Sequence, residues 1–282
     1  MIQEQIDLNF QNDKKLALWK LSSSNCQADK NVFLTHGTFS DKKVCLGIGE
    51  YLVGKGYNCW VLEWRNHGSS SRTEGHCSFE MIGKEDMQRA FDYLFNEVNL
   101  EKIDCITHSG GGINLTINLL TYPENISRIN RIVFFACQSF GAGYSLKNQV
   151  KLFLGKYLTK AIGFLPAKLL GRPHNEPYQF MKQWFDWNLS GEFQSDDGMN
   201  YGREMSKIKI PILSISGSGD YFVAPPKGCE MFLLKFENAE NEFLNCGQET
   251  GFFEDYDHSR LIYSRNAEKE IYPLALRWIE KS

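Results

Sequence analysis

The chain has 282 residues, of which 42% are hydrophobic, so it can form one large domain or two small ones with a sizeable core. Its formal net charge of −3 gives no reason to expect nucleic acid as a partner. The N-terminus lacks the basic start and apolar stretch of a signal peptide, and no apolar run approaches the roughly 18 residues of a membrane span.

The pattern of apolar residues predicts a hairpin followed by strands that alternate with helices. Two alternating runs, 5–10 and 16–21, flank a polar segment and predict the hairpin. Continuous apolar strands between helices indicate an α/β fold with a mostly parallel sheet that is covered on both faces. Further strands are predicted at 31–35, 57–64, 103–107, 131–137, 210–216 and 242–246, and helices at 43–53, 79–98, 111–120 and about 267–281.

One long segment, 140–205, interrupts this alternation. It is largely helical in pattern and too long for a connecting loop. We interpret it as a helical cap inserted into a core domain formed by residues 1–139 and 206–282. The cap is rich in aromatic residues, which either roof a substrate pocket or only pack the cap onto the core.

The stretch "CITHSGGGINL", residues 105–115, is the strongest candidate for a site. An apolar strand runs into Ser109 and then into three glycines that begin a helix. This pattern is typical of a sharp turn that holds a nucleophilic serine at the carboxyl end of a strand. Small residues are needed two positions before and after the serine. Here these are Thr107, where glycine is usual, and Gly111.

A serine hydroxyl needs a base and an orienting carboxylate to act as a nucleophile. In this architecture they follow the serine in the order acid, then histidine. Asp220 follows the strand 210–216 through a Gly-Ser-Gly turn, and His258 is the only histidine after that strand. We therefore predict a catalytic triad of Ser109, Asp220 and His258. Asp255 and Asp257 are too close to His258 in sequence to orient its ring.

The loop after the strand 31–35 is predicted to complete an oxyanion hole. Gly37 would let the backbone turn so that the Thr38 N–H, or alternatively that of Phe39, faces the reacting centre together with the Gly110 N–H. His36 would then be structural. His108 is predicted to point away from the serine hydroxyl. Candidate residues of the substrate pocket are Phe39, His108, Trp184 and Trp187.

Five ordered blocks together resemble the α/β-hydrolase family: "LTHGTFSD", "VLEWRNHGSSS", "ITHSGGG", "SGSGDYFVAPP" and "DYDHSRL". The resemblance runs from about Val32 to the C-terminus, with Glu63 and Asn66 as departures from the second block. Two weaker resemblances concern subgroups of the family. Residues 169–187 are similar to a Gln-Trp-x-x-Trp pattern of bacterial predicted hydrolases, and residues 78–94 to lipase-like members.

The resemblance and the candidate triad imply a serine hydrolase that cleaves carboxylic esters through an acyl-enzyme, on substrates with an apolar acyl or aromatic group. A serine aminopeptidase, thioesterase, lactonase or acyltransferase would use the same triad, and a non-catalytic ligand-binding member of the fold is a further alternative. No cofactor and no metal are predicted, because no His/Asp cluster has ligand spacing. The oligomeric state is left open.

Two further features bear on the environment of the protein. The eight cysteines are scattered singly, which favours reduced thiols and a cytoplasmic protein. Between residues 140 and 175 six basic residues occur without an acid. On a helical wheel Lys147 and Lys151 fall away from Lys156 and Lys160, which favours a solvated cap face over a contact with membrane lipid.

Overall fold

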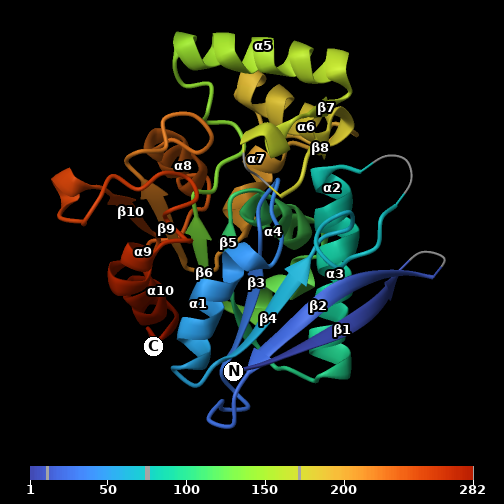
Figure 1. The fold of residues 1–282 in the computed structure, drawn as a ribbon, viewed down its shortest axis with the longest axis vertical. Coiled ribbons are helices and arrows are strands. Elements are labelled where there is room, and N and C mark those ends of the chain that lie inside the picture. Colours follow the sequence, from blue (N-terminus) through green and yellow to red (C-terminus); the bar gives the residue numbers. More distant parts are fainter. Residues whose placement is uncertain (11–12, 74–76, 171–172, 282) are drawn as a thin grey trace.

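The computed structural model describes residues 1–10, 13–73, 77–170 and 173–281. Its central feature is an eight-stranded sheet in the order β1-β2-β4-β3-β5-β6-β9-β10 (Figure 1). β2 pairs antiparallel with β1 and β4, and all the other neighbouring strands are parallel. The strands are β1 (Ile2–Phe10), β2 (Lys14–Ser22), β3 (Asn31–Thr35), β4 (Asn58–Glu63), β5 (Ile103–His108), β6 (Ile129–Phe135), β9 (Ile212–Gly217) and β10 (Glu242–Cys246).

Helices cover both faces of this sheet, because alternate residues of the buried strands point to opposite sides. Phe33 and Cys105 join one apolar cluster with α4 and the helical segment 79–97. Val32 and Ile106, their neighbours in sequence, join a second cluster with α1 and α10. The helices around the sheet are α1 (Lys43–Val53), α2 (Phe79–Met81), α3 (Met87–Asp92), α4 (Gly110–Thr121), α8 (Pro226–Leu233), α9 (Arg265–Glu270) and α10 (Tyr272–Ile279).

The predicted elements agree with this architecture, with two differences in detail. The C-terminal helix is broken into α9 and α10, because Pro273 in the first turn of α10 has no N–H to continue the preceding helix. The predicted helix 79–98 is helical from residue 79 to residue 97 and includes two π-helical turns, Ile82–Asp86 and Tyr93–Glu97. The mostly parallel sheet with helices on both faces is confirmed.

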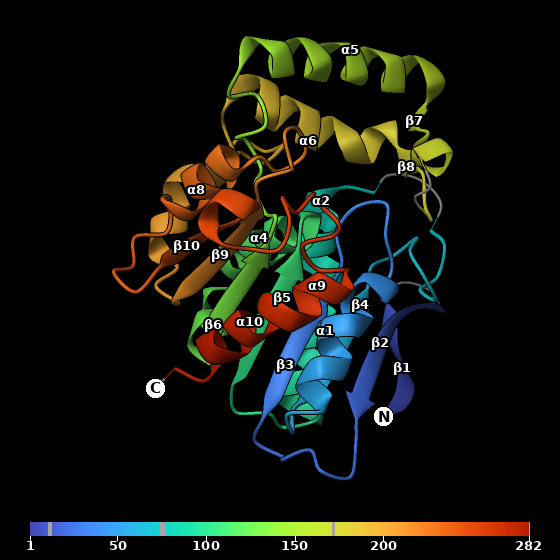
Figure 2. The same cartoon turned by 60° about the vertical axis from the view of Figure 1, so that its left-hand side comes forward.

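The segment 140–205 lies largely beyond the carboxyl ends of the central strands, as a layer of its own (Figure 2), while its last part, residues 201–205, contacts α4 beside the sheet. It contains α5 (Leu146–Ile162), β7 (Phe164–Leu165), β8 (Glu176–Pro177), α6 (Tyr178–Ser190) and α7 (Tyr201–Glu204). α5 packs on α6, and α6 lies between α5 and the sheet. The Glu80 carboxylate ties this layer to the helix below it, since it accepts hydrogen bonds from Gln183 at 2.9 Å and Tyr201 at 2.6 Å. The domain boundaries stay a prediction.

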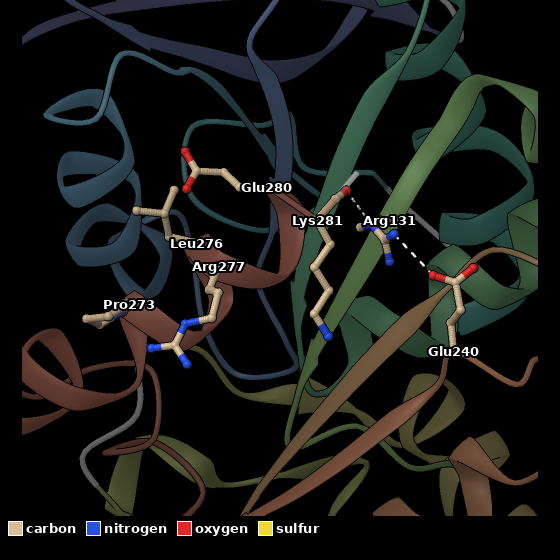
Figure 3. Close-up of a pocket in the computed structure, with 7 residues that line it drawn as sticks. All are labelled: Arg131, Glu240, Pro273, Leu276, Arg277, Glu280 and Lys281. Carbon is tan, nitrogen blue, oxygen red and sulfur yellow. Dashed lines mark hydrogen bonds and ion pairs between the residues drawn. The ribbon is translucent and has the colours of Figure 1, made fainter.

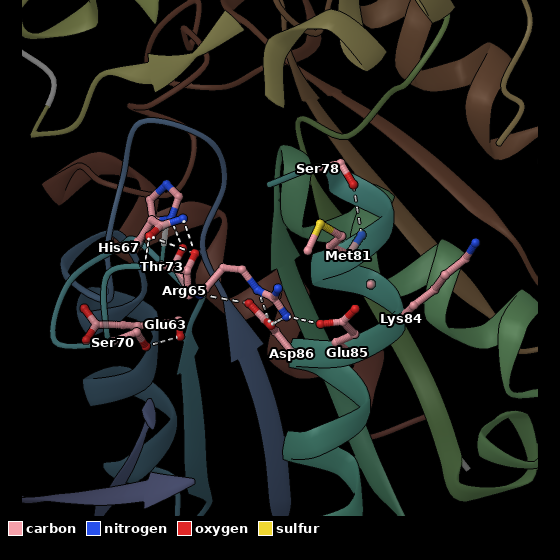
Figure 4. Close-up of polar contacts among 12 residues, drawn as sticks. Glu63, Arg65, His67, Ser70, Thr73, Ser78, Met81, Lys84, Glu85 and Asp86 are labelled. Atoms are coloured by element: carbon pink, nitrogen blue, oxygen red, sulfur yellow. Dashed lines mark hydrogen bonds and ion pairs between the residues drawn. The ribbon is translucent and has the colours of Figure 1, made fainter. Parts of the chain in front are cut away.

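A buried ion pair joins the loop after β4 to the segment 82–86 (Figure 4). Arg65 and Asp86 are both almost completely buried, and the Arg65 Nε donates to Asp86 Oδ1 at 2.8 Å while its backbone N–H donates to Oδ2. The half-exposed Glu85 accepts a further bond from the guanidinium. Among the described residues, no helix combines the length and hydropathy needed to cross a bilayer.

Candidate active site

Ser109 stands in a sharp turn between β5 and α4. Its backbone has φ 52° and ψ −123°, which is unusual for a residue with a side chain and stores strain of about 1–3 kcal/mol. Two of the three glycines that follow, Gly111 and Gly112, are required by space. A Cβ on Gly111 would lie 2.6 Å from the His36 carbonyl oxygen, and one on Gly112 would lie 2.4 Å from a cysteine sulfur. The turn therefore presents the Ser109 hydroxyl at the carboxyl end of the sheet.

The structure brings Ser109, His258 and Asp220 into one line. The His258 Nε2 lies 2.9 Å from Ser109 Oγ, and its Nδ1 lies 2.6 Å from Asp220 Oδ2. Because the carboxylate accepts the Nδ1 proton, Nε2 is left to accept the proton of the serine hydroxyl. The predicted partners thus meet although 38 and 149 residues separate His258 from Asp220 and Ser109.

The Asp220 carboxylate is held by the backbone of its own loop. The N–H groups of Val223 and Ala224 each donate to it at 2.9 Å. Burial alone would raise the pKa of this carboxyl, but His258 and the backbone amides outweigh burial and lower the pKa below its ordinary value. Asp220 is therefore ionised at neutral pH and can stabilise a protonated His258.

The residues beside the triad support the position of the base. His108 Nε2 donates to the His258 carbonyl oxygen at 3.0 Å, and the centroids of the two rings are 5.0 Å apart. Asp257, next to His258, accepts the backbone N–H groups of Ser259 and Arg260 and so shapes the turn without meeting the imidazole. His108 thus holds the histidine loop against the end of β5, a contact that its position in the sequence did not reveal.

The two backbone amides predicted to form the oxyanion hole belong to different segments of the chain, and both of these residues line the cavity at Ser109. Gly110 begins α4, and the first N–H groups of a helix have no partner within it. Thr38 lines the same cavity as Ser109 and Gly110. Gly37 has no positive φ; it is needed because a Cβ there would lie 2.7 Å from Ser109 Cβ. The Phe39 N–H donates to Glu176 Oε1 at 2.8 Å and is thereby engaged with the layer above, so Thr38 stays the predicted donor of the two.

A cluster of buried ionisable residues connects this loop to the layer above it. Glu176 Oε1 accepts from Phe39 N–H and also lies 2.7 Å from His67 Nε2. Burial of His67 would lower its pKa, but the charge and hydrogen bond of Glu176 outweigh burial and raise the pKa. His174 Nε2 lies 3.6 Å from Asp41 Oδ2, an ion-pair contact, and this histidine together with the Lys43 N–H lowers the pKa of the Asp41 carboxyl to about 2.

His36 is the structural histidine that the sequence predicted. Its Nε2 accepts the Trp64 N–H at 3.3 Å, so its Nδ1 carries the proton and donates to the Gly37 carbonyl at 2.7 Å. Complete burial lowers the pKa of His36 well below its ordinary value and keeps the ring neutral. Glu63, a departure from the family pattern, accepts the N–H groups of Lys42 and Ser69 and thereby joins two loops.

A cavity of about 670 Å³ opens onto Ser109 and His258. Among the predicted pocket residues, Phe39, His108 and Trp184 line it. Trp187 does not, because its ring packs on Phe79 and Phe193 and its Nε1 donates to the Gln194 carbonyl. Most of the remaining side chains near the serine are apolar, namely Phe79, Ile113, Leu165, Met181, Phe222 and Val223.

A second hollow lies elsewhere on the molecule, at the amino end of β6 (Figure 3). Arg131 bridges the Glu240 carboxylate and the Lys281 carbonyl oxygen there, and α10 supplies most of the other lining residues. The hollow is shallow and open, and none of the candidate catalytic residues lines it. The cavity at Ser109 is therefore the candidate active site.

Comparison with known proteins agrees with the fold. A protein family described as the alpha/beta hydrolase fold matches residues 30–133, which run from β3 through the Ser109 turn to β6. The strand order and the helices on both faces extend the agreement to the rest of the chain. The chain therefore has the α/β-hydrolase fold, as its sequence motifs indicated.

Solved structures of esterases and a lipase share this fold at low sequence identity. An esterase from Exiguobacterium antarcticum aligns over 98% of this chain and 99% of its own, with a TM-score of 0.68 and 12% identity. A monoacylglycerol lipase from Paleococcus ferrophilus covers 94% and 98%, with a TM-score of 0.64 and 17% identity. Alpha/beta hydrolase domain-containing protein 10 from mouse covers 98% of both chains, with a TM-score of 0.65 and 13% identity. No curated protein sequence matches this chain.

Proposed function

We propose that this protein is a serine hydrolase that cleaves carboxylic esters through a covalent acyl-enzyme. The observation that carries the proposal is the hydrogen-bonded line from Ser109 through His258 to Asp220, at the edge of a largely apolar cavity. The esterases and the lipase among the structural neighbours support the same class of substrate.

The first half of the reaction forms the acyl-enzyme. The Ser109 oxygen attacks the ester carbonyl carbon while His258 Nε2 takes the hydroxyl proton, and ionised Asp220 stabilises the resulting imidazolium. The carbonyl oxygen becomes an oxyanion, which the N–H groups of Thr38 and Gly110 bind. The carbon–oxygen bond to the alcohol then breaks, and His258 returns the proton to the leaving oxygen.

The second half repeats these steps with water in place of the serine. His258 takes a proton from a water that attacks the acyl carbon, and the ester bond to Ser109 breaks as His258 reprotonates the serine oxygen. The oxyanion is stabilised again at the same two amides, and the partial positive charge at the start of α4 adds to this effect. Removal of one such donor typically costs about 2.7–4 kcal/mol of barrier.

The surroundings of the serine favour an apolar acyl group over a peptide amino terminus. Binding of a free amine would require an acidic side chain facing the cavity. Asp41 is an acid that lines the cavity, but its carboxylate lies beside His174 and accepts the Lys43 N–H. Glu176 does not line the cavity, and its carboxylate is engaged with Phe39 and His67. Met181 and Trp184 instead offer an apolar surface above the reacting centre.

The experiment that tests the proposal is hydrolysis of p-nitrophenyl esters of graded acyl length by wild type and Ser109→Ala. We expect the variant to lose turnover to near background. Ser190→Ala, an exposed serine at the end of α6, is the matched control and should keep wild-type turnover. Turnover by Ser109→Ala close to that of wild type would contradict the proposal.

A further inference from the structure

α5 is the outermost helix of the molecule and contacts the rest of the protein along one side only (Figures 1 and 2). The side chains that face inward are those of Asn148, Leu152 and Thr159, which are buried. Asn148 donates to the Ala142 carbonyl oxygen at 2.9 Å and so anchors the first turn. The orientation of α5 about its own axis is therefore set by contacts with the protein.

The opposite side of α5 is apolar and exposed to solvent. Leu146, Leu154 and Leu158 are 76%, 62% and 61% exposed. Isolated exposed leucines are ordinary on protein surfaces, but a row of large apolar side chains along one helix marks an interaction site. The seven large apolar residues exposed on this helix are Leu146, Val150, Phe153, Leu154, Tyr157, Leu158 and Ile162.

Lysines border this apolar face on both sides. Residues seven apart lie in nearly the same row of a helix, because each turn takes about 3.6 residues. Lys151 therefore precedes Leu158 along one edge of the face, and Lys160 follows Phe153 along the other. Lys147 extends the first edge. The lysines that are well separated on the helical wheel therefore have an apolar strip between them. This arrangement differs from the solvated face that the charge pattern alone favours.

Few of these charges are neutralised within the protein. Lys156 pairs with Asp186 of α6. Lys147 and Lys160 have no carboxylate at ion-pair distance in the part of the chain that the structure describes. Lys151 Nζ stands 5.3 Å from the centre of the Phe222 ring. Arg172, another of the basic residues of this segment, lies outside the described residues.

We propose that the outer face of α5 binds an anionic lipid surface. The helix would lie in the plane of the headgroups, with its leucines and aromatic rings at the acyl boundary and its lysines at the phosphate level. The long aliphatic stems of lysine suit this position, since they cover apolar surface while the ammonium group reaches the anionic headgroup.

The charge pattern favours lipid over a second copy of the chain as the occupant. A symmetric dimer would bring the same face of both subunits together. α5 contains four lysines and no acidic residue, so such an interface would oppose like charges along both edges. An anionic membrane surface matches the lysines and also takes up the apolar strip.

This surface has a consequence for the cavity, which rests on the proposed function. Lys151 and Gly155 of α5 line the cavity that opens onto Ser109, as does the exposed Tyr263. A lipid surface bound by α5 would therefore lie beside the cavity wall. Ester substrates dissolved in that surface would have a short path to the serine.

The test is co-sedimentation with vesicles of mixed phosphatidylserine and phosphatidylcholine, or of phosphatidylcholine alone. We expect wild type to bind the anionic vesicles more tightly. The double variant Leu154→Gln with Leu158→Gln should lose binding by about tenfold or more. Leu234→Gln is the matched control, because Leu234 is 70% exposed and stands at the end of a different helix, α8. It should bind as wild type does.

A second double variant separates charge from apolar contact. Lys147→Gln with Lys160→Gln should weaken binding to the anionic vesicles by about tenfold and leave binding to phosphatidylcholine alone nearly unchanged. Circular dichroism and turnover of a short, soluble ester should be those of wild type in all of these variants. Ser109→Ala should bind vesicles as wild type does, so failure of the proposed chemistry is distinguishable from failure of the lipid contact.

Two results would overturn the proposal. One is equal vesicle binding by wild type and the Leu154/Leu158 double variant. The other is an absence of vesicle binding together with a wild-type dimer, seen by sedimentation velocity, that the same double variant converts to a monomer. That second result would assign the face to a second copy of the chain.

Discussion

Replacement of Glu176 by glutamine tests how strongly the segment 140–205 is bound to the loop that follows β3. The carboxylate oxygen of Glu176 meets the Phe39 N–H at 2.8 Å and His67 Nε2 at 2.7 Å, and the side chains of Glu176 and His67 are 3% and 2% exposed. Glutamine keeps the shape and one acceptor but removes the charge. The substitution therefore measures the contribution of the carboxylate charge to the free energy of unfolding.

The expected loss of stability follows from the difference in strength between charged and neutral hydrogen bonds. Bonds to a charged group contribute about 1.5–3 kcal/mol and neutral ones about 0.5–1.5 kcal/mol, so Glu176→Gln should lower the free energy of unfolding by about 1–2 kcal/mol. Because Glu176 raises the pKa of His67, this contribution is fully present below the unfolded pKa of histidine, about 6.5. It is lost as pH rises through the folded pKa of His67.

The assay is urea unfolding of wild type and Glu176→Gln between about pH 5.5 and pH 9. Glu192→Gln serves as the control. Glu192 is exposed in the same segment, and this substitution removes the same charge. The difference between wild type and Glu176→Gln should shrink as pH rises. A difference no larger than that of the control, or one that grows with pH, would refute the reasoning.

Three further predictions follow from the geometry, the last with a control substitution. Gly37→Ala would place a Cβ 2.7 Å from Ser109 Cβ, so kcat should fall by about 100-fold with unchanged circular dichroism, and a near-wild-type kcat would argue against this contact. Asp220→Asn should lower kcat by about 10⁴-fold through the wrong His258 tautomer, and ester turnover close to wild type would speak against Asp220 as the orienting acid. Asp86→Asn removes the fully buried carboxylate that pairs with Arg65 and leaves the guanidinium with the half-exposed Glu85, so it should cost about 3–5 kcal/mol in urea unfolding. Glu85→Gln, which is half exposed, should cost less than about 1 kcal/mol, and equal losses would contradict the buried-pair explanation.

Sequence alone could predict the sheet and the candidate triad, because both depend on local signals at strand ends. Ser109 and Asp220 each follow an apolar strand directly, and parallel strands end at the same edge of a sheet. Chain order then singled out His258. The strained backbone at Ser109 and the close contacts of Gly111 supply the physical reason for the glycine-rich turn.

Features that depend on contacts between distant segments were not predictable in this way. Glu176 has no sequence signal that marks it, since its role comes from the approach of Phe39 and His67. Trp184 and Trp187 were equal candidates for the pocket, and only their packing separates them. A helical wheel gives the angles between the lysines of α5 but not which side of the helix meets the protein.

The most direct test of the central claim is labelling with a fluorophosphonate, which forms a bond between phosphorus and an activated serine oxygen as fluoride leaves. Mass spectrometry of the digested protein should find the adduct on Ser109, and His258→Ala should form it far more slowly than wild type. An adduct on a different serine, no adduct at all, or equal labelling rates with and without His258 would contradict the account.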